Sequence, residues 1–138
     1  KLVILGCRAV YGEEMEFAKA NEDRVALVTA AELLRGGAEE GLEKIQGWLG
    51  EASSTYVSVD MDVVDPAQAP AVGNPSPEGI GITLLIDLIH MCADGRTRGF
   101  DLTEVTPHYD SGLTATQAAY VTLETIYALE AASRRQPR

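Results

Sequence analysis

Tyr56-Val57-Ser58-Val59-Asp60-Met61-Asp62-Val63-Val64-Asp65-Pro66 is an apolar, β-branched run that ends in three acids. The run predicts a strand, and Pro66 stops further ladder pairing because proline has no backbone N–H to donate. In an extended chain, residues i and i+2 point to the same face about 6.6 Å apart, so Asp60 and Asp62 should present their carboxylates side by side. We therefore expect a site for one or two cations at the exit of this strand, with Asp65 bracing the turn before the proline.

Strands and helices alternate along the rest of the chain. Apolar runs predict three further strands, at residues 2–6, 24–28 and 99–105. Helical spacing and capping patterns predict helices at 13–20, 30–37, 39–49 and 82–95, and a last helix from residue 114 to the basic tail at 134–138. This alternation predicts parallel βαβ units, an α/β fold with helices on both faces of the sheet.

Two helix starts carry the capping-box pattern, Thr29-Ala30-Ala31-Glu32 and Thr114-Ala115-Thr116-Gln117. Apolar residues at helical spacing predict which faces point inward. The expected inward residues are Leu42, Ile45, Trp48 and Leu49; Ile82, Leu85, Ile86 and Ile89; and Val121, Leu123, Ile126 and Leu129. His90 lies on the helix at 82–95, and we interpret it as a structural side chain.

Composition narrows the function. The 138 residues are 46% hydrophobic, which is enough for one domain with a core. The net charge of −10 argues against a nucleic-acid partner and agrees with a cationic ligand or a metal ion. Cys7 and Cys92 lie far apart without a C-x-x-C pattern, so a reduced, cytoplasmic setting is expected. No apolar run approaches the roughly 18 residues of a membrane span. Lys1 opens the chain directly before a strand, as expected of the middle of a longer protein.

Acids gather at two strand exits. Ligands of parallel α/β sheets bind outside the carboxyl ends of the strands, where Asp60, Asp62 and Glu104 should lie. The loop at residues 66–81 contains four prolines and three glycines, as is typical of a loop that forms a site.

A D-x-D motif at a strand exit has two enzyme interpretations. The first resembles the haloacid-dehalogenase-like phosphatases, in which the two acids serve as nucleophile and general acid with Mg²⁺. That family carries the motif on its first strand and needs a lysine downstream. Here the only lysines, Lys1, Lys19 and Lys44, all precede the motif, which counts against this interpretation.

The second interpretation is the arginase and agmatinase family, the ureohydrolases. Residues 58–66 match the family's S-x-D-x-D-x-x-D-P, and Ala69-Pro70-Ala71-Val72-Gly73-Asn74-Pro75 resembles the loop that follows it. Asp101-Leu102-Thr103-Glu104-Val105-Thr106-Pro107 matches D-x-x-E-V-x-P. The resemblance covers nearly the whole chain and implies a three-layer α/β/α fold with a mainly parallel sheet.

The resemblance implies a binuclear-manganese hydrolase of guanidino compounds. Asp60 and Asp62 would be Mn²⁺ ligands, Glu104 would hold the substrate's guanidinium, and no other catalytic residue would come from this chain. Chemistry agrees, because oxygen-rich sites suit Mn²⁺, two metals can generate hydroxide near neutral pH, and a carboxylate matches the guanidinium fork.

The family's other ligands, a histidine and a D-x-H-x-D segment, have no counterpart here. The two histidines, His90 and His108, stand outside any such context. Residues 1–138 therefore resemble the C-terminal half of a single ureohydrolase domain, and we expect the chain alone to be inactive.

The sequence constrains the substrate and the partners less than it constrains the fold and the class of reaction. Tyr11 stands where arginases place an acid, which favours agmatine, while arginase, guanidinobutyrase and formimidoylglutamase activities stay open. Asn74, where a threonine is usual, and Glu78, before Gly79 where a glycine pair is common, depart from the arginase loop. The family implies a homo-oligomer, trimer or hexamer, or pairing with the missing N-terminal half. The alternative of another class is a non-catalytic folding or oligomerisation module, whose sheet edge would seek a partner strand.

Overall fold

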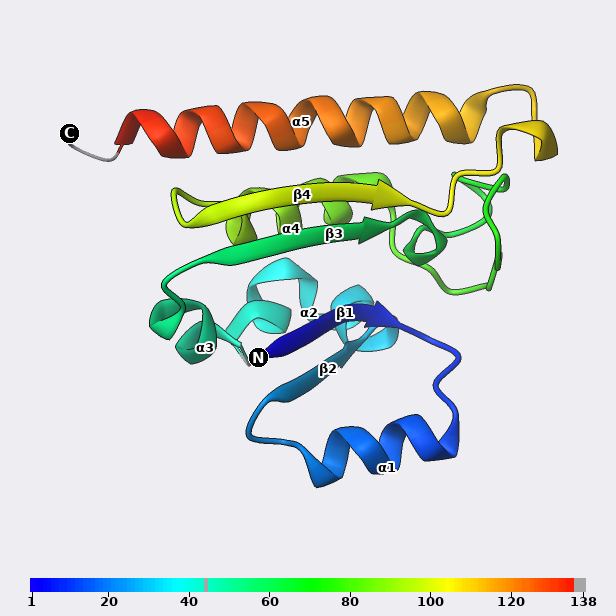
Figure 1. Cartoon of the computed structure of the whole chain (residues 1–138). Coiled ribbons are helices and arrows are strands. Elements are labelled where there is room, and N and C mark those ends of the chain that lie inside the picture. The colour runs from blue at the N-terminus through cyan, green and yellow to red at the C-terminus, as the bar shows by residue number, and fades with distance from the viewer. Residues whose placement is uncertain (44, 136–138) are drawn as a thin grey trace.

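All four predicted strands form, and the third ends earlier than expected, at Asp60. The computed structural model describes residues 1–43 and 45–135 (Figure 1), so residue 44 and the tail at 136–138 lie outside the described residues. The strands are β1 (Leu2–Cys7), β2 (Val25–Thr29), β3 (Thr55–Asp60) and β4 (Thr97–Thr103). The helices are α1 (Gly12–Ala20), α2 (Ala30–Glu43), α3 (Gln46–Glu51), α4 (Ile82–Cys92) and α5 (Leu113–Arg135), with 3₁₀ turns η1 (Met61–Val63) and η2 (Pro107–Tyr109).

The strands form two parallel pairs. β1 pairs with β2 and β3 pairs with β4, and the second pair runs in register up to Asp60 beside Thr103. All four arrows point the same way in Figure 1. The parallel α/β prediction is confirmed, but the described strands form two separate two-stranded sheets, and β1 and β3 each keep one unpaired edge.

α2 packs closely on one face of the β1–β2 pair, whereas the side toward α1 stays largely exposed. Alternate residues of a strand point to opposite faces, and on one face Val3 and Leu5 pack into the core that includes Leu33 of α2. On the other face, Leu2 and Ile4 look toward Phe17 of α1 across a cavity. Within the described residues, no helix has both the length and the hydrophobicity needed to cross a membrane.

The helix predicted at 39–49 is divided. α2 kinks at Gly37, where φ is +72° and ψ is −174°, continues to Glu43, and is followed by the short α3. Leu42 and Ile45 are buried as expected. Trp48 is only half-buried, and the Lys1 Nζ lies 5.0 Å from the centre of its ring. Spacing thus predicted the buried positions of Leu42 and Ile45, whereas Trp48 and Leu49 are only half-buried and the break between two helices was not predicted.

α5 differs from its prediction at both its start and its face. The carboxylate of Asp110, not a threonine capping box, accepts the Thr114 backbone N–H at 2.8 Å, so the helix begins at Leu113. Val121 is fully buried as expected, whereas Leu123 is 43% exposed and Ile126 is 54% exposed. The small or polar residues Ala118 and Thr125 are buried instead.

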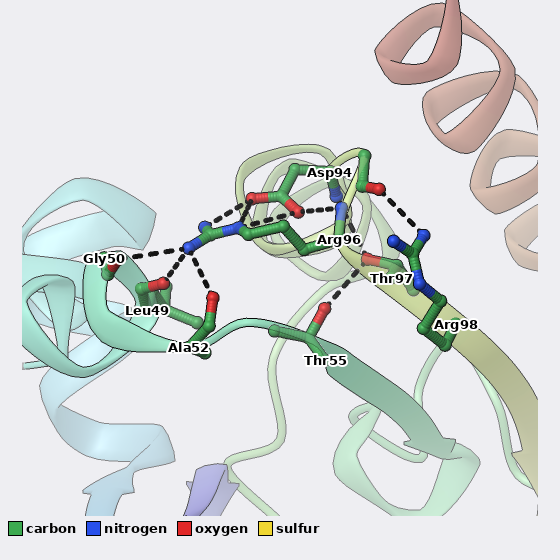
Figure 2. Close-up of polar contacts among 9 residues, drawn as sticks. Leu49, Gly50, Ala52, Thr55, Asp94, Arg96, Thr97 and Arg98 are labelled. Carbon is green, nitrogen blue, oxygen red and sulfur yellow. Dashed lines mark hydrogen bonds and ion pairs between the residues drawn. The ribbon is translucent and has the colours of Figure 1, made fainter. Parts of the chain in front are cut away.

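An arginine fastens the ends of β3 and β4 that lie away from the predicted site. Arg96 donates to the carbonyl oxygens of Leu49, Gly50 and Ala52 at the end of α3, and its guanidinium pairs with Asp94 at 2.5 Å (Figure 2). Hydrogen bonds from Arg96 hold the pKa of Asp94 below its usual value. These contacts supply partners for the last carbonyls of a helix. The opposite ends of β3 and β4 carry the acids.

Gly6 gives a test of the packing between the strand pairs. It has a φ of +86°, and a β-carbon there would overlap Cγ2 of Val63. We expect Gly6→Ala to lower the free energy of unfolding by about 2–4 kcal/mol, from backbone strain and overpacking together. The matched control is Gly12→Ala, because a β-carbon at Gly12 meets no heavy atom within 4 Å. In urea denaturation, the free energy of unfolding of Gly12→Ala should lie within about 0.5 kcal/mol of that of the parent chain. Equal losses of stability in Gly6→Ala and Gly12→Ala would contradict the packing role of Gly6.

Candidate metal centre

Asp60 is the last residue of β3, and Asp62 lies in the 3₁₀ turn that follows. The side chain of Asp60 caps this turn, with Oδ1 accepting the backbone N–H of Asp62 at 2.9 Å. The expectation of two carboxylates spaced along an extended strand is therefore wrong, because the strand ends at Asp60, two residues before Asp62. Both residues nevertheless line the same cavity.

The charged residues of the cavity are mostly acidic. The cavity has a volume of about 620 Å³ and lies between the β1–β2 pair, α1 and the turn after β3. Most of its lining is apolar, but it includes the acids Glu13, Glu14, Asp60 and Asp62 and a single basic residue, Arg8. The excess of acids favours a cation over an anion at the end of the cavity beside the turn after β3.

The loop after η1 positions Asp62 and is itself held by Asp65. The backbone N–H of Asn74 donates to Oδ1 of Asp62 at 3.1 Å. Asp65 accepts from the backbone N–H of Ala67 at 2.9 Å through Oδ1 and from that of Gly79 at 3.1 Å through Oδ2. The prediction that Asp65 braces the turn before the proline is confirmed.

Glu104 directly follows β4 and has an unusual backbone. Its φ is +64°, a conformation that costs a residue other than glycine about 1–3 kcal/mol and that is concentrated at functional sites. A β-carbon built on Gly73 would overlap Oε2 of Glu104 and lie 4.0 Å from Oδ1 of Asp62. Gly73 thus lies between the Glu104 and Asp62 carboxylates. Because glycine has no side chain, the space between the two carboxylates stays open.

The loop reaches Glu104 because its middle is anchored twice. Val72 forms an antiparallel bridge with Val105, and the Thr106 N–H donates to the Ala71 carbonyl oxygen at 2.9 Å. The Ala71 N–H donates in turn to the hydroxyl of the fully buried Thr114 at 2.9 Å. The exits of β3 and β4 and the start of α5 are therefore connected through one segment of the loop.

Asp101 is a second carboxylate in the same strand, and it has a different environment. It accepts hydrogen bonds from Ser58 Oγ at 2.6 Å and Tyr56 Oη at 2.7 Å, which hold the pKa of Asp101 below its usual value. This clasp ties β3 to β4 two residues before Asp60. Sequence alone did not predict it, although parallel pairing of the two matched motifs would place Ser58 beside Asp101.

The structure shows the positions of the residues that differ from the arginase pattern. Glu78 has a φ of +61°, so its backbone keeps a conformation that glycine adopts freely. Asn74 contributes its backbone N–H to Asp62. Tyr11 precedes the first residue of α1, and its side chain is 77% exposed, a position that favours no particular substrate. His90 pairs with Glu124 of α5 at 3.3 Å, which agrees with a structural role.

The donor chemistry suits Mn²⁺, but the donors in this chain are too few for a complete site. Asp60 and Asp62 offer the carboxylate oxygens that this ion prefers. Within residues 1–43 and 45–135, no group of three or more His, Cys, Asp or Glu side chains is arranged to hold a metal ion. Asp60 and Asp62 could therefore serve a metal ion only together with ligands from outside the described residues.

Comparison with known proteins gives a consistent assignment. The family model described as the arginase family matches residues 1–127. The chain is 36% identical over 125 residues to proclavaminate amidinohydrolase of Streptomyces clavuligerus, which covers 90% of the chain and 39% of that protein. It is 35% identical over 122 residues to agmatinase of Bacillus subtilis, which covers 86% of the chain and 39% of that protein.

A solved structure agrees in fold. The agmatine ureohydrolase of Thermoplasma volcanium superposes with a TM-score of 0.83 at 31% identity, over 99% of this chain and 44% of that one. The chain thus spans about two fifths of the length of these relatives.

Proposed function

Because the chain belongs to the arginase family, we propose that it is the C-terminal half of a ureohydrolase that uses two Mn²⁺ ions to hydrolyse agmatine to putrescine and urea. The proposal covers residues 1–138 as one half of a single domain. One observation carries it: Asp62, directly after β3, and Glu104, directly after β4, lie on either side of Gly73, and Asp62 shares a cavity with Asp60 at the end of β3.

Each acid has a distinct task in the proposed reaction. Asp60 and Asp62 would hold manganese, and Glu104 would accept two parallel hydrogen bonds from the guanidinium, which fixes the orientation of its carbon. When bound, the manganese pair lowers the pKa of water so that a hydroxide is available near neutral pH. Hydrolysis then forms a C–O bond at the guanidinium carbon and breaks its C–N bond to the alkyl amine, whose nitrogen takes up a proton.

A second substrate class has specific support. The relative from Streptomyces clavuligerus, named for proclavaminate, is as similar to this chain as the agmatinase of Bacillus subtilis. A human relative that is 41% identical over 75 residues is a guanidino acid hydrolase, so a guanidino acid is the second candidate. Comparing urea release from agmatine, arginine and 4-guanidinobutyrate by the full-length protein tests the choice; agmatine is the expected best substrate, and a clear preference for either acid would contradict it.

Two features support pairing with further polypeptide. β1 and β3 each leave one strand edge unpaired among the described residues, and unpaired edges are ready to bond another strand. α5 exposes Tyr120, Leu123, Ile126 and Tyr127, each at least 43% exposed. We propose that the N-terminal half of the same protein covers these surfaces, in a cytoplasmic homo-oligomer. Size-exclusion chromatography of the chain with and without a supplied N-terminal half tests this pairing; a strictly monomeric chain that ignores the other half would contradict it.

The chain alone should release no substantial urea from agmatine with Mn²⁺ added, because Asp60 and Asp62 cannot hold a binuclear centre without further ligands. A colorimetric urea assay on the purified 138-residue chain measures this directly. The full-length protein under the same conditions is the positive control. Turnover by the isolated chain at a rate comparable to that of the full-length protein would overturn the proposed division of the site.

A further inference from the structure

Arg8 joins two elements that are distant in sequence. It follows β1, and its side chain donates to the carbonyl oxygens of Asp62 and Val63 in the turn after β3, the latter at 2.7 Å. These partners lie 54 and 55 residues away. Arginine suits this task because its guanidinium presents several N–H donors in a rigid fork that can reach two adjacent carbonyls at once.

The turn that carries Asp62 is held by backbone hydrogen bonds on its C-terminal side, where the Ile80 N–H donates to the Val63 carbonyl oxygen at 3.0 Å. The β3–β4 ladder ends at Asp60, so the peptide of Asp62 lies beyond strand pairing. Its N–H bonds to the Asp60 side chain and its Oδ1 accepts from Asn74, whereas its carbonyl oxygen accepts from Arg8. Arg8 therefore fixes the plane of the peptide from which the Asp62 carboxylate projects.

Gly79 leaves room for this contact. A β-carbon at Gly79 would overlap the backbone N of Asp65 and lie 2.6 Å from Nη1 of Arg8, so a side chain there would press on both. The guanidinium therefore passes a stretch of backbone that carries no side chain, which is an observation independent of the hydrogen bonds.

Arg8 also lines the same cavity as the two aspartates. It is half-buried and is the only basic residue lining the described part of a cavity that also contains Glu13, Glu14, Asp60 and Asp62. Among the described residues, its side-chain hydrogen bonds go to backbone carbonyl oxygens of the turn and not to a carboxylate.

We propose that Arg8 is a positioning residue that orients the Asp62 carboxylate and thereby raises the manganese affinity of the site. This inference rests on the proposed function, because it takes Asp62 to be a metal ligand. Arg8 itself touches neither metal nor substrate in this role; it acts through the backbone of the turn.

Manganese binding by the full-length protein tests the proposal, using Arg8→Gln, Arg8→Lys and Arg24→Gln. Arg24 is the matched control, because its guanidinium bonds Asn21 Oδ1 at the far end of the β1–β2 pair. Calorimetric titration with Mn²⁺ should show affinity lower by about 10-fold or more in Arg8→Gln, as for other residues that orient metal ligands. Arg8→Lys should lie between Arg8→Gln and the parent protein, since an ammonium keeps the charge but loses the fork.

Thermal unfolding without metal separates positioning from general stability. Arg24→Gln should keep the parent affinity for Mn²⁺ whatever its melting temperature. Parent-like affinity in Arg8→Gln, or equal losses in Arg8→Gln and Arg24→Gln, would overturn the inference while leaving the proposed function intact. If Arg8→Gln does not fold, the Mn²⁺ affinity of Arg8→Lys is the deciding measurement. Parent-like affinity in Arg8→Lys would overturn the claim that the Arg8 guanidinium is needed to position Asp62. A parent protein that binds no Mn²⁺ would overturn the proposed function and this inference with it.

Discussion

Asp60→Ala and Asp62→Ala should each lose bound manganese and urea-forming activity together in the full-length protein. Each change removes a carboxylate that lines the cavity beside the turn after β3, and a metal ion stabilises the transition state by several kcal/mol. A loss of about 4 kcal/mol corresponds to about a 10³-fold fall in kcat/KM. Metal content by mass spectrometry and urea release by colorimetry are the two measurements.

Asp23→Ala is the matched control for these variants. Asp23 is an exposed acid in the turn before β2, at the opposite end of the β1–β2 pair from Gly6 and Arg8, and it does not line the cavity. It should keep both manganese and activity. Retention of the full metal content by either Asp60→Ala or Asp62→Ala would show that the metal assignment is wrong.

Glu104→Ala should keep the metals and lose substrate. Its carboxylate is proposed to pair with the guanidinium, and truncating one partner of a buried, hydrogen-bonded charge pair costs about 2–5 kcal/mol. We therefore expect kcat/KM to fall by about 10²–10³-fold with unchanged manganese content.

Glu104→Gly is the sharper variant. Glycine accepts the φ of +64° at this position without strain, so the free energy of unfolding should stay level or rise by up to about 1 kcal/mol while activity is lost. Gly73→Ala should lower activity without removing the acid, because its methyl group would displace the Glu104 carboxylate. Full activity in Glu104→Gly would contradict a substrate-binding role, and loss of manganese there would reassign Glu104 to the metal site.

Local patterns predicted the elements of this fold well. The strand at residues 55–60 and the helix at 82–92 follow from apolar periodicity, which is a property of neighbouring residues. The capping box at Thr29 is formed as predicted, with the Thr29 N–H donating to Glu32 Oε2 at 2.7 Å. The bracing role of Asp65 was also predictable, because aspartate before proline commonly bonds nearby backbone N–H groups in turns.

The detailed shape of the candidate site was not predictable in the same way. Asp62 leaves the strand because its turn is held by Arg8 from 54 residues away and by the loop at Asn74. Neither contact has a signature in the sequence around Asp62. Residues i and i+2 share a face only while the backbone stays extended, and the extended backbone of β3 ends at Asp60.

Tertiary packing also decided which apolar residues are buried. Leu123 and Ile126 have helical spacing but face outward on α5, where the small side chain of Ala118 packs inward instead. The two strand pairs likewise remain separate, although the sequence predicts one mainly parallel sheet. Both features leave apolar or strand-edge surface exposed, which agrees with a chain that spans about two fifths of its relatives' length.

Anomalous diffraction at the manganese edge, from crystals of the full-length protein grown with Mn²⁺, tests the central claim most directly. We predict two manganese peaks about 3.5–4 Å apart, both within coordination distance of the carboxylates of Asp60 and Asp62. Peaks that lie elsewhere, or that are reached by neither aspartate, would contradict the claim that this chain supplies one part of a two-metal site.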